Sequence, residues 1–162
     1  MMLEELLHLG WELLLAGGAT TCFAVMLGVP KREYLSCGLV GALGWVVYTL
    51  LVDQGQGPAL AALVASIPLT ALARTFSIWH KAPVTIFLIS GIFPLVPGAG
   101  IYYTAYYFIM NDPRLSAKGL ETLQVALALA LGMTIVLGMP LPRRLMASKM
   151  KSPKEAAARK SS

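Results

Sequence analysis

An uncharged run over residues 83–110 constrains the fold of this chain more than any other feature of its sequence. As one straight α-helix, this run would be about 42 Å long at about 1.5 Å per residue. The hydrocarbon core of a bilayer is only about 30 Å thick. The middle of the run contains two prolines and two glycines: Pro94, Pro97, Gly98 and Gly100. The sequence therefore predicts a membrane segment of two helical pieces, joined by a non-helical stretch at residues 93–100.

Four further apolar stretches are long enough, or nearly long enough, to cross a bilayer, which takes about 20 residues. They cover residues 13–29 (with an extension back to residue 3), 35–52, 58–79 and 120–139. Only 13% of the residues are charged, whereas a typical soluble domain has about 25%. We therefore expect an all-α, polytopic membrane helix bundle of about five transmembrane helices, the fourth of which is broken by its Pro/Gly segment.

Basic residues are distributed unevenly along the chain, and their placement predicts an orientation. Suppose that the N-terminus is outside and the chain crosses the membrane five times. Eleven of the thirteen basic residues then fall inside, four from the helical part and seven from the tail. This distribution follows the positive-inside rule. Residues 1–142 are then the transmembrane domain of a multi-pass plasma (inner) membrane protein. The basic residues 143–162 form a cytoplasmic tail that we expect to be disordered. Because the basic residues flank apolar blocks, we expect no binding to nucleic acid.

The break at residues 93–100 is the strongest candidate for a functional site. Lipid cannot satisfy backbone groups that leave helical geometry, so such breaks lie against protein or a water-filled cavity. Transporters use them to present helix ends to substrates, and the positive end of the following helix would favour a carboxylate. The substrate path would be shaped by the four residues already named: Pro94, Pro97, Gly98 and Gly100. The alternative is a proline-kinked helix with a structural role only.

Three other residues could act beside the break. Arg74 lies well inside the third apolar stretch, so it either faces a cavity or a partner or extends its side chain to the inner headgroups. Tyr102 belongs to a group of four tyrosines that could form an aromatic belt, although its hydroxyl could also contact a ligand at the break. His80 could relay protons, since imidazole titrates near neutral pH, or could simply lie at the membrane interface.

Small residues in the second apolar stretch indicate close helix packing. Gly38, Gly41 and Gly44 repeat every three residues, and small residues let membrane helices approach each other closely. The neighbouring helix could belong to this chain, to a partner subunit or to a second copy of the chain. We expect the two cysteines, Cys22 and Cys37, to be small buried hydrophobes without a disulfide.

Motifs for enzymatic chemistry are absent from the sequence. It contains no GxSxG, HExxH or P-loop motif, no CxxC spacing and no carboxylate pair within an apolar stretch. All acidic residues fall at the ends of apolar stretches or between them. We therefore expect no catalytic activity, no metal site and no cofactor.

Two sequence segments resemble a known family. Residues 73–83 read ARTFSIWHKAP, and residues 91–98 read GIFPLVPG. Together with CGLVGALGW at residues 37–45, they resemble the threonine/serine exporter family, specifically the small, C-terminal-type subunit of its split two-component members. The PLVPG run is the most specific part. The resemblance extends over residues 10–140 and does not include the basic tail.

This resemblance implies a membrane subunit of a secondary transporter that exports small carboxylate-bearing metabolites, either threonine and serine or a dicarboxylate such as succinate. It also implies a larger partner subunit with membrane helices of its own. Arg74 and Tyr102 would then lie near the substrate path, and the coupling ion would be a proton carried by His80 or by the partner. The alternative is a non-transporting membrane scaffold that stabilises another membrane protein.

Overall fold

The computed structural model describes the backbone of residues 2–140 and the side chains of residues 10–140. In this part of the chain every regular element is a helix, as the sequence predicts. The proposed basic tail, 143–162, and the last two residues of the proposed transmembrane domain lie outside the described residues.

The helices follow the apolar stretches closely. In chain order they are α1 (Met2–Met26), the 3-10 turn η1 (Lys31–Glu33), α2 (Tyr34–Asp53), α3 (Pro58–His80), α4 (Val84–Ile92), the 3-10 turn η2 (Phe93–Leu95), α5 (Gly98–Ile109) and α6 (Leu115–Gly138). The last helix begins at Leu115 instead of Leu120. Lys118 and Glu121 form an ion pair within its first turns, and such i,i+3 pairs stabilise a helix beyond its apolar part.

The helix count is broadly consistent with the predicted bundle of about five helices, three or four of which are long enough to span a membrane. In the described residues, three segments are long and apolar enough to cross a membrane: Lys31–Asp53, Pro58–His80 and Leu115–Gly138. The pair Val84–Leu95 and Gly98–Ile109 makes a fourth if its two pieces form one broken span. The apolar part of α1, Gly10–Met26, is shorter than a full span.

The fourth segment is broken as predicted, although the break is shorter than the predicted stretch 93–100. The turn η2 extends the first piece through Leu95, and α5 already begins at Gly98. Only Val96 and Pro97 therefore lie outside helices, and the axes of the two pieces differ by 56°. Pro94 lies in the first turn of η2, where the chain changes from α-helical to the tighter 3-10 geometry.

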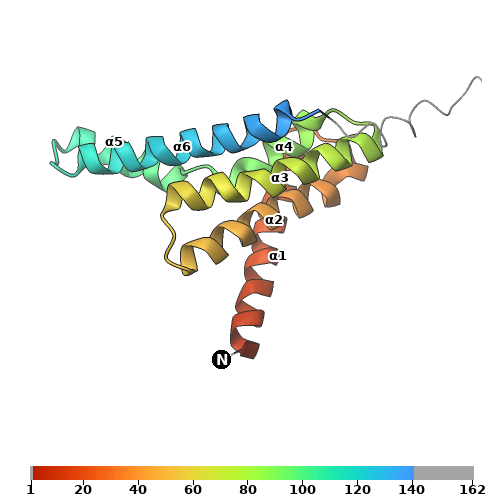
Figure 1. Ribbon diagram of the computed structural model, residues 1–162, viewed down its shortest axis with the longest axis horizontal. Helices are drawn as coiled ribbons and strands as arrows, with labels where there is room; N and C mark the ends of the chain where they lie inside the picture. The colour runs from red at the N-terminus through yellow and green to blue at the C-terminus, as the bar shows by residue number, and fades with distance from the viewer. Residues whose placement is uncertain (1, 141–162) are drawn as a thin grey trace, which may run out of the picture.

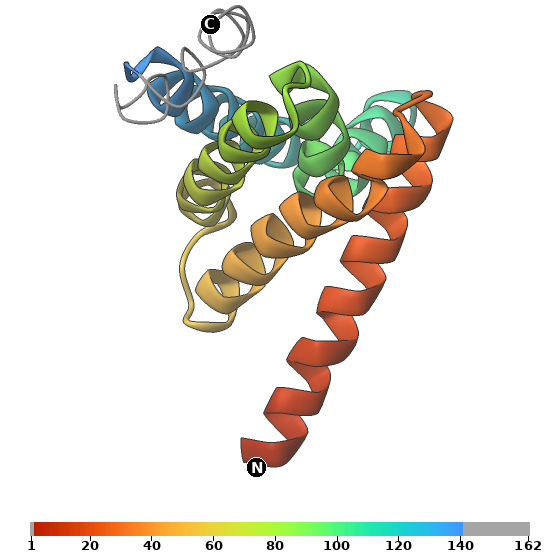
Figure 2. The same cartoon turned by 90° about the vertical axis from the view of Figure 1, so that its right-hand side faces the viewer.

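Helix α2 lies at the centre of the fold, packed against α1, α3 and α4 (Figures 1 and 2). Its small residues allow these contacts: Gly38 and Gly41 face α1, and Gly44 faces α3 and η2. A Cβ atom at Gly38 would lie only 2.6 Å from the Oγ1 atom of Thr21. The glycine repeat therefore packs against helices of this chain.

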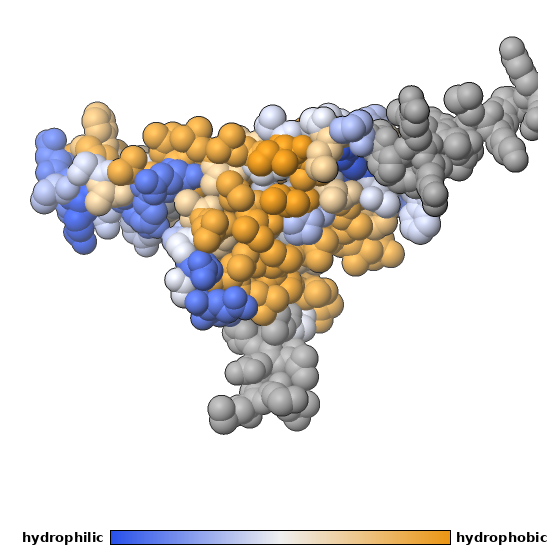
Figure 3. Space-filling model, in the orientation of Figure 1, coloured by the Kyte–Doolittle hydropathy of each residue, from blue (hydrophilic) through white to orange (hydrophobic). Residues whose placement is uncertain are grey.

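Helices α5 and α6 form a hairpin that extends beyond the rest of the bundle (Figure 1). Helix α5 packs mainly on α6 and contains no buried residue. Arg114 closes the turn between them by donating to the Asp112 carboxylate at 2.8 Å, which holds the pKa of that carboxyl below its usual range. Hydrophilic surface gathers at this turn and at the α2–α3 turn, whereas the surface over the middle of α2, α3 and α6 is apolar (Figure 3).

The two cysteines lie in different environments. Cys37 is buried, but Cys22 is exposed, so the prediction that both are buried is wrong for Cys22. An apolar residue on a membrane helix can face lipid as well as protein, and the sequence pattern does not distinguish the two. Neither cysteine forms a disulfide.

Candidate functional site

A pocket of about 420 Å³, with charged side chains on one wall, opens at the break between η2 and α5. Its walls come from α2, the start of α3, the break itself and the first turns of α6. The lining residues are Trp45, Tyr48, Pro58, all seven residues of 94–100, Lys118, Glu121, Thr122 and Val125. We call it the break pocket. Pro94, Pro97, Gly98 and Gly100, which the sequence assigns to a substrate path, all line it.

Two opposite charges lie on one wall of the break pocket. The Nζ atom of Lys118 lies 3.0 Å from both carboxylate oxygens of Glu121. Both side chains are partly exposed, at 33% and 46%. Each can therefore leave this ion pair and bind a charged group of a ligand instead. This pair was not predicted as a site from the sequence, because i,i+3 charges at a helix start are typical of an ordinary solvated face.

The first turn of α5 faces the same pocket. The first N–H groups of an α-helix have no acceptor within the helix, and the helix dipole makes this end partly positive. A Cβ atom at Gly98 would meet nothing within 4 Å, whereas one at Gly100 would lie 2.6 Å from Thr122 Oγ1. Gly98 therefore borders open space, and Gly100 allows α5 to lie close against α6.

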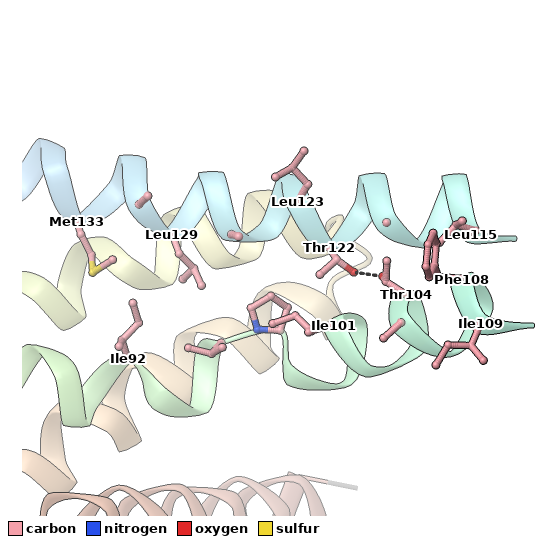
Figure 4. A pocket seen from close by; sticks show the side chains of 16 residues that line it. Ile92, Ile101, Thr104, Phe108, Ile109, Leu115, Thr122, Leu123, Leu129 and Met133 are labelled. Atoms are coloured by element: carbon pink, nitrogen blue, oxygen red, sulfur yellow. Dashed lines mark hydrogen bonds between the residues drawn. The ribbon is translucent and has the colours of Figure 1, made fainter. Parts of the chain in front are cut away.

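An apolar groove of about 740 Å³ lies on the other side of the break. It runs between α6 and the two pieces α4 and α5, with Ile92, Ile101 and Met133 among the side chains lining the gap (Figure 4). The lining includes two hydroxyl groups, those of Thr104 and Thr122, whose oxygen atoms lie 3.4 Å apart. This groove suits a lipid chain or an apolar helix, whereas the break pocket suits a polar ligand.

The structure does not bring Arg74 to the break pocket. From α3, its guanidinium donates hydrogen bonds to the carbonyl oxygens of Val136 and, at 2.9 Å, Met139. These carbonyls lie at the C-terminal end of α6, which has no helical donors left and carries partial negative charge. Arg74 is thus positioned to cap α6.

We expect Arg74→Ala to lower the free energy of unfolding by about 1–2 kcal/mol, since two carbonyls lose a charged donor in a partly exposed site. Thermal unfolding of the purified protein in detergent measures this change. Thr75→Ala is the matched control, because the Thr75 hydroxyl bonds only to the Ala71 carbonyl of its own helix. An Arg74→Ala variant as stable as the control would contradict the capping role.

Tyr102 does not line the break pocket either. Its side chain is 65% exposed, and its ring stacks on Tyr106 and meets Tyr103 edge-on. The four tyrosines of α5 form a continuous aromatic surface, because Tyr107 in turn contacts Tyr103 and Tyr106. This surface is continuous with the exposed face of α5.

His80 meets a buried acid that the sequence analysis did not single out. The Nδ1 atom of His80, at the end of α3, bonds to Oε2 of Glu33 in η1. Glu33 does lie at the end of an apolar stretch, yet it is only 1% exposed. Its position beside Lys31 and Arg32 in the sequence is typical of a solvated interface, so only the fold reveals the burial.

Comparison with known proteins identifies the family of this chain. Residues 12–139 match the family described as "Threonine/Serine exporter, ThrE". A curated relative from Mycobacterium tuberculosis (strain ATCC 25618 / H37Rv), named "Probable threonine/serine exporter", is 33% identical over 119 residues. That alignment covers 72% of this chain but only 22% of the relative. No solved structure matches.

The family match covers most of the chain and includes every helix that lines the break pocket. The apolar segments described above are long and apolar enough to cross a membrane. The chain therefore belongs to the threonine/serine exporter family and is a multi-pass membrane protein.

Proposed function

We propose that this chain is the membrane subunit of a secondary transporter that exports small carboxylate-bearing metabolites, threonine and serine first among them, together with a larger partner subunit. The break pocket carries this proposal, because it combines a cation, an anion and a helix N-terminus around one opening. The transport cycle needs binding and release only, so no covalent step is assigned to any residue.

The charges of the break pocket favour an amino acid over a dicarboxylate. The carboxylate of a zwitterion would pair with Lys118 and with the N–H groups at the start of α5. Its ammonium group would pair with Glu121. A dicarboxylate such as succinate offers no cation to Glu121, so like charges would oppose each other there.

The positive-inside rule supports an orientation with the N-terminus outside and the C-terminus in the cytoplasm. In this orientation the break pocket lies in the outer half of the protein, near the α2–α3 turn and the start of α6. The opposite ends of α2 and α3, with Lys31, Arg32 and Lys81, then lie inside.

The exposed hairpin supports a partner subunit. Helix α5 buries no residue, and the apolar groove leaves one side of the break uncovered by the residues that the structure describes. Broken helices in membranes lie against protein or water, since lipid cannot satisfy free backbone groups. A partner helix in the groove would enclose the break, and a second copy of the chain is the alternative occupant.

Reconstitution of the chain with its partner subunit in liposomes tests the proposal. We expect efflux of labelled threonine or serine to require both subunits. Neutralising the pocket charges in Lys118→Met or Glu121→Gln should reduce this efflux about tenfold or more, since a charged hydrogen bond contributes about 1.5–3 kcal/mol and 1.4 kcal/mol is a factor of ten.

Two controls make the outcome decisive. Glu121→Gln should affect succinate less than threonine, because only the amino acid presents an ammonium group. Full efflux by the partner alone, with this chain raising only the partner's stability, would replace the proposal with the scaffold role. Unchanged threonine efflux in both charge variants would exclude the break pocket as the substrate site.

A further inference from the structure

A buried acid and a histidine meet at the opposite end of α2 from the break pocket. Glu33 belongs to η1, just before α2, and His80 is the last residue of α3. The side chain of Glu33 is 2% exposed and that of His80 33%, so water reaches the imidazole but hardly the carboxylate. Between Glu33 and Tyr48 of the break pocket, α2 spans about 22 Å.

The surroundings of this pair contain one direct counter-charge. Arg32 places Nε 3.0 Å from Glu33 Oε1, but its side chain is 73% exposed.

The other titratable or charged neighbours in sequence are Lys31, Tyr34 and Lys81, and Cys37 follows one helical turn after Glu33. Helix α4 contributes Phe87 and has no ionisable side chain. On the end of α1 that precedes η1, the only titratable group is the exposed Cys22.

We propose that the Glu33–His80 pair binds the proton whose movement is coupled to export; this inference rests on the proposed transport function. With the carboxylate ionised, Nδ1–H of a neutral imidazole donates to Oε2 of Glu33. This tautomer leaves Nε2 free to accept one proton, which gives an imidazolium held by the carboxylate. In the proposed cycle the proton comes from the outer side, and its loss to cytoplasmic water restores the neutral imidazole, so each cycle carries one proton inward and no other bond changes.

The pair is positioned to pass this charge change to the broken span. The His80 ring contacts two phenylalanine rings, Phe76 of α3 and Phe87 of α4, with centroids 5.8 and 6.2 Å away, and these two rings also contact each other at 6.2 Å. A cation is attracted to aromatic faces and a neutral imidazole much less so. Protonation therefore changes the contact between α3 and α4, and α4 leads after nine residues into η2 and the break.

Local contacts hold the junction between α3 and α4. Lys81 adopts a left-handed conformation with φ of 54°, and the Ser77 hydroxyl donates to the Ala82 carbonyl at 2.6 Å. Phe87 is fully buried. In the proposed orientation the pair lies at the cytoplasmic end, where an exporter that exchanges substrate for protons must release them.

Gradient-driven transport separates coupling from transport itself. The assay uses liposomes that contain this chain and its partner. A pH difference of one unit corresponds to about 1.4 kcal/mol per proton, and a tenfold concentration ratio corresponds to the same free energy. Each proton exchanged therefore supports about tenfold accumulation of threonine. Equilibrium exchange of labelled threonine at equal pH needs no net proton movement. We expect Glu33→Gln and His80→Gln to lose accumulation, with a ratio falling to about one, while exchange stays within about twofold of the wild type.

Two further variants complete the experiment. Glu33→Asp keeps a carboxylate and should restore part of the accumulation. Asp112→Asn removes the partly exposed carboxylate paired with Arg114 and should match the wild type in both assays. Accumulation by both Gln variants at the wild-type ratio would overturn the inference and leave the transport function intact. Loss of exchange together with accumulation would also overturn it, because it indicates a structural pair. Absence of exchange in the wild type would refute the proposed function, and the inference with it.

Discussion

Gly132→Val is expected to disrupt the packing of α3 against α6 more than any other single substitution considered for this chain. A Cβ atom at Gly132 would lie 2.8 Å from the backbone oxygen of Leu63 and closer still to the Ser66 hydroxyl. Neither can move freely, because that hydroxyl already donates to the Leu63 carbonyl at 2.7 Å. Forcing extra carbon atoms into a packed interface costs about 1–3 kcal/mol or more, so folded protein in the membrane should fall sharply.

Gly138→Ala is the matched control on the same helix. A Cβ atom at Gly138 would meet nothing within 4 Å, and alanine is favoured over glycine in a helix by about 1 kcal/mol. Thermal unfolding in detergent and the amount of protein in the membrane fraction measure both variants. If Gly132→Val unfolded at the same temperature as Gly138→Ala, the close approach of α3 and α6 would be wrong.

The helices of this chain can be predicted from its sequence because the bilayer requires a minimum length of apolar residues. A span must be apolar over about 20 residues, so the helices α2 and α3 begin and end within a residue or two of the predicted bounds. The break is also predictable, since proline and glycine interrupt a run too long for one crossing. Its length was overestimated because the 3-10 turn η2 continues the helical path through Pro94 and Leu95.

The composition of the polar sites could not be predicted, because it depends on contacts between distant residues. Glu33 and His80 are separated by 47 positions in the chain, and each alone is typical of a membrane interface. Arg74 was predicted near the substrate path on the family resemblance, but it reaches toward the C-terminal end of α6. The rotation of a helix about its axis decides such cases, and hydropathy carries little information about it.

Part of the break pocket could be predicted from the sequence, and part could not. Its floor, from Pro94 to Gly100, follows from the sequence, whereas its charged wall comes from a helix that begins earlier than the apolar pattern indicates. Lys118 and Glu121 become candidate ligands only once α6 lies beside α5. A signal that could have identified them is their i,i+3 spacing next to an apolar helix, but that spacing is also the commonest surface pattern.

Filling the break pocket without changing its charges should stop transport. Gly98 begins α5 and borders open space at the pocket, so Gly98→Leu places a bulky side chain where we expect the substrate carboxylate. We expect threonine exchange in liposomes with the partner subunit to fall about tenfold or more, because the substrate can no longer reach the N–H groups of α5. The temperature of unfolding should change little, since the added atoms meet no packed neighbour.

Gly98→Ala separates the effect of volume from that of backbone freedom. Both substitutions remove the glycine, but alanine adds a single carbon to a pocket of about 420 Å³, so exchange should stay close to the wild-type rate. Gly100→Ala is expected to behave differently again, because its Cβ atom would press on Thr122 and lower stability before it blocks the pocket. Equal exchange rates for Gly98→Leu and Gly98→Ala would show that substrate passes elsewhere, and the apolar groove on the other side of Val96 and Pro97 would then have to be considered as part of the route.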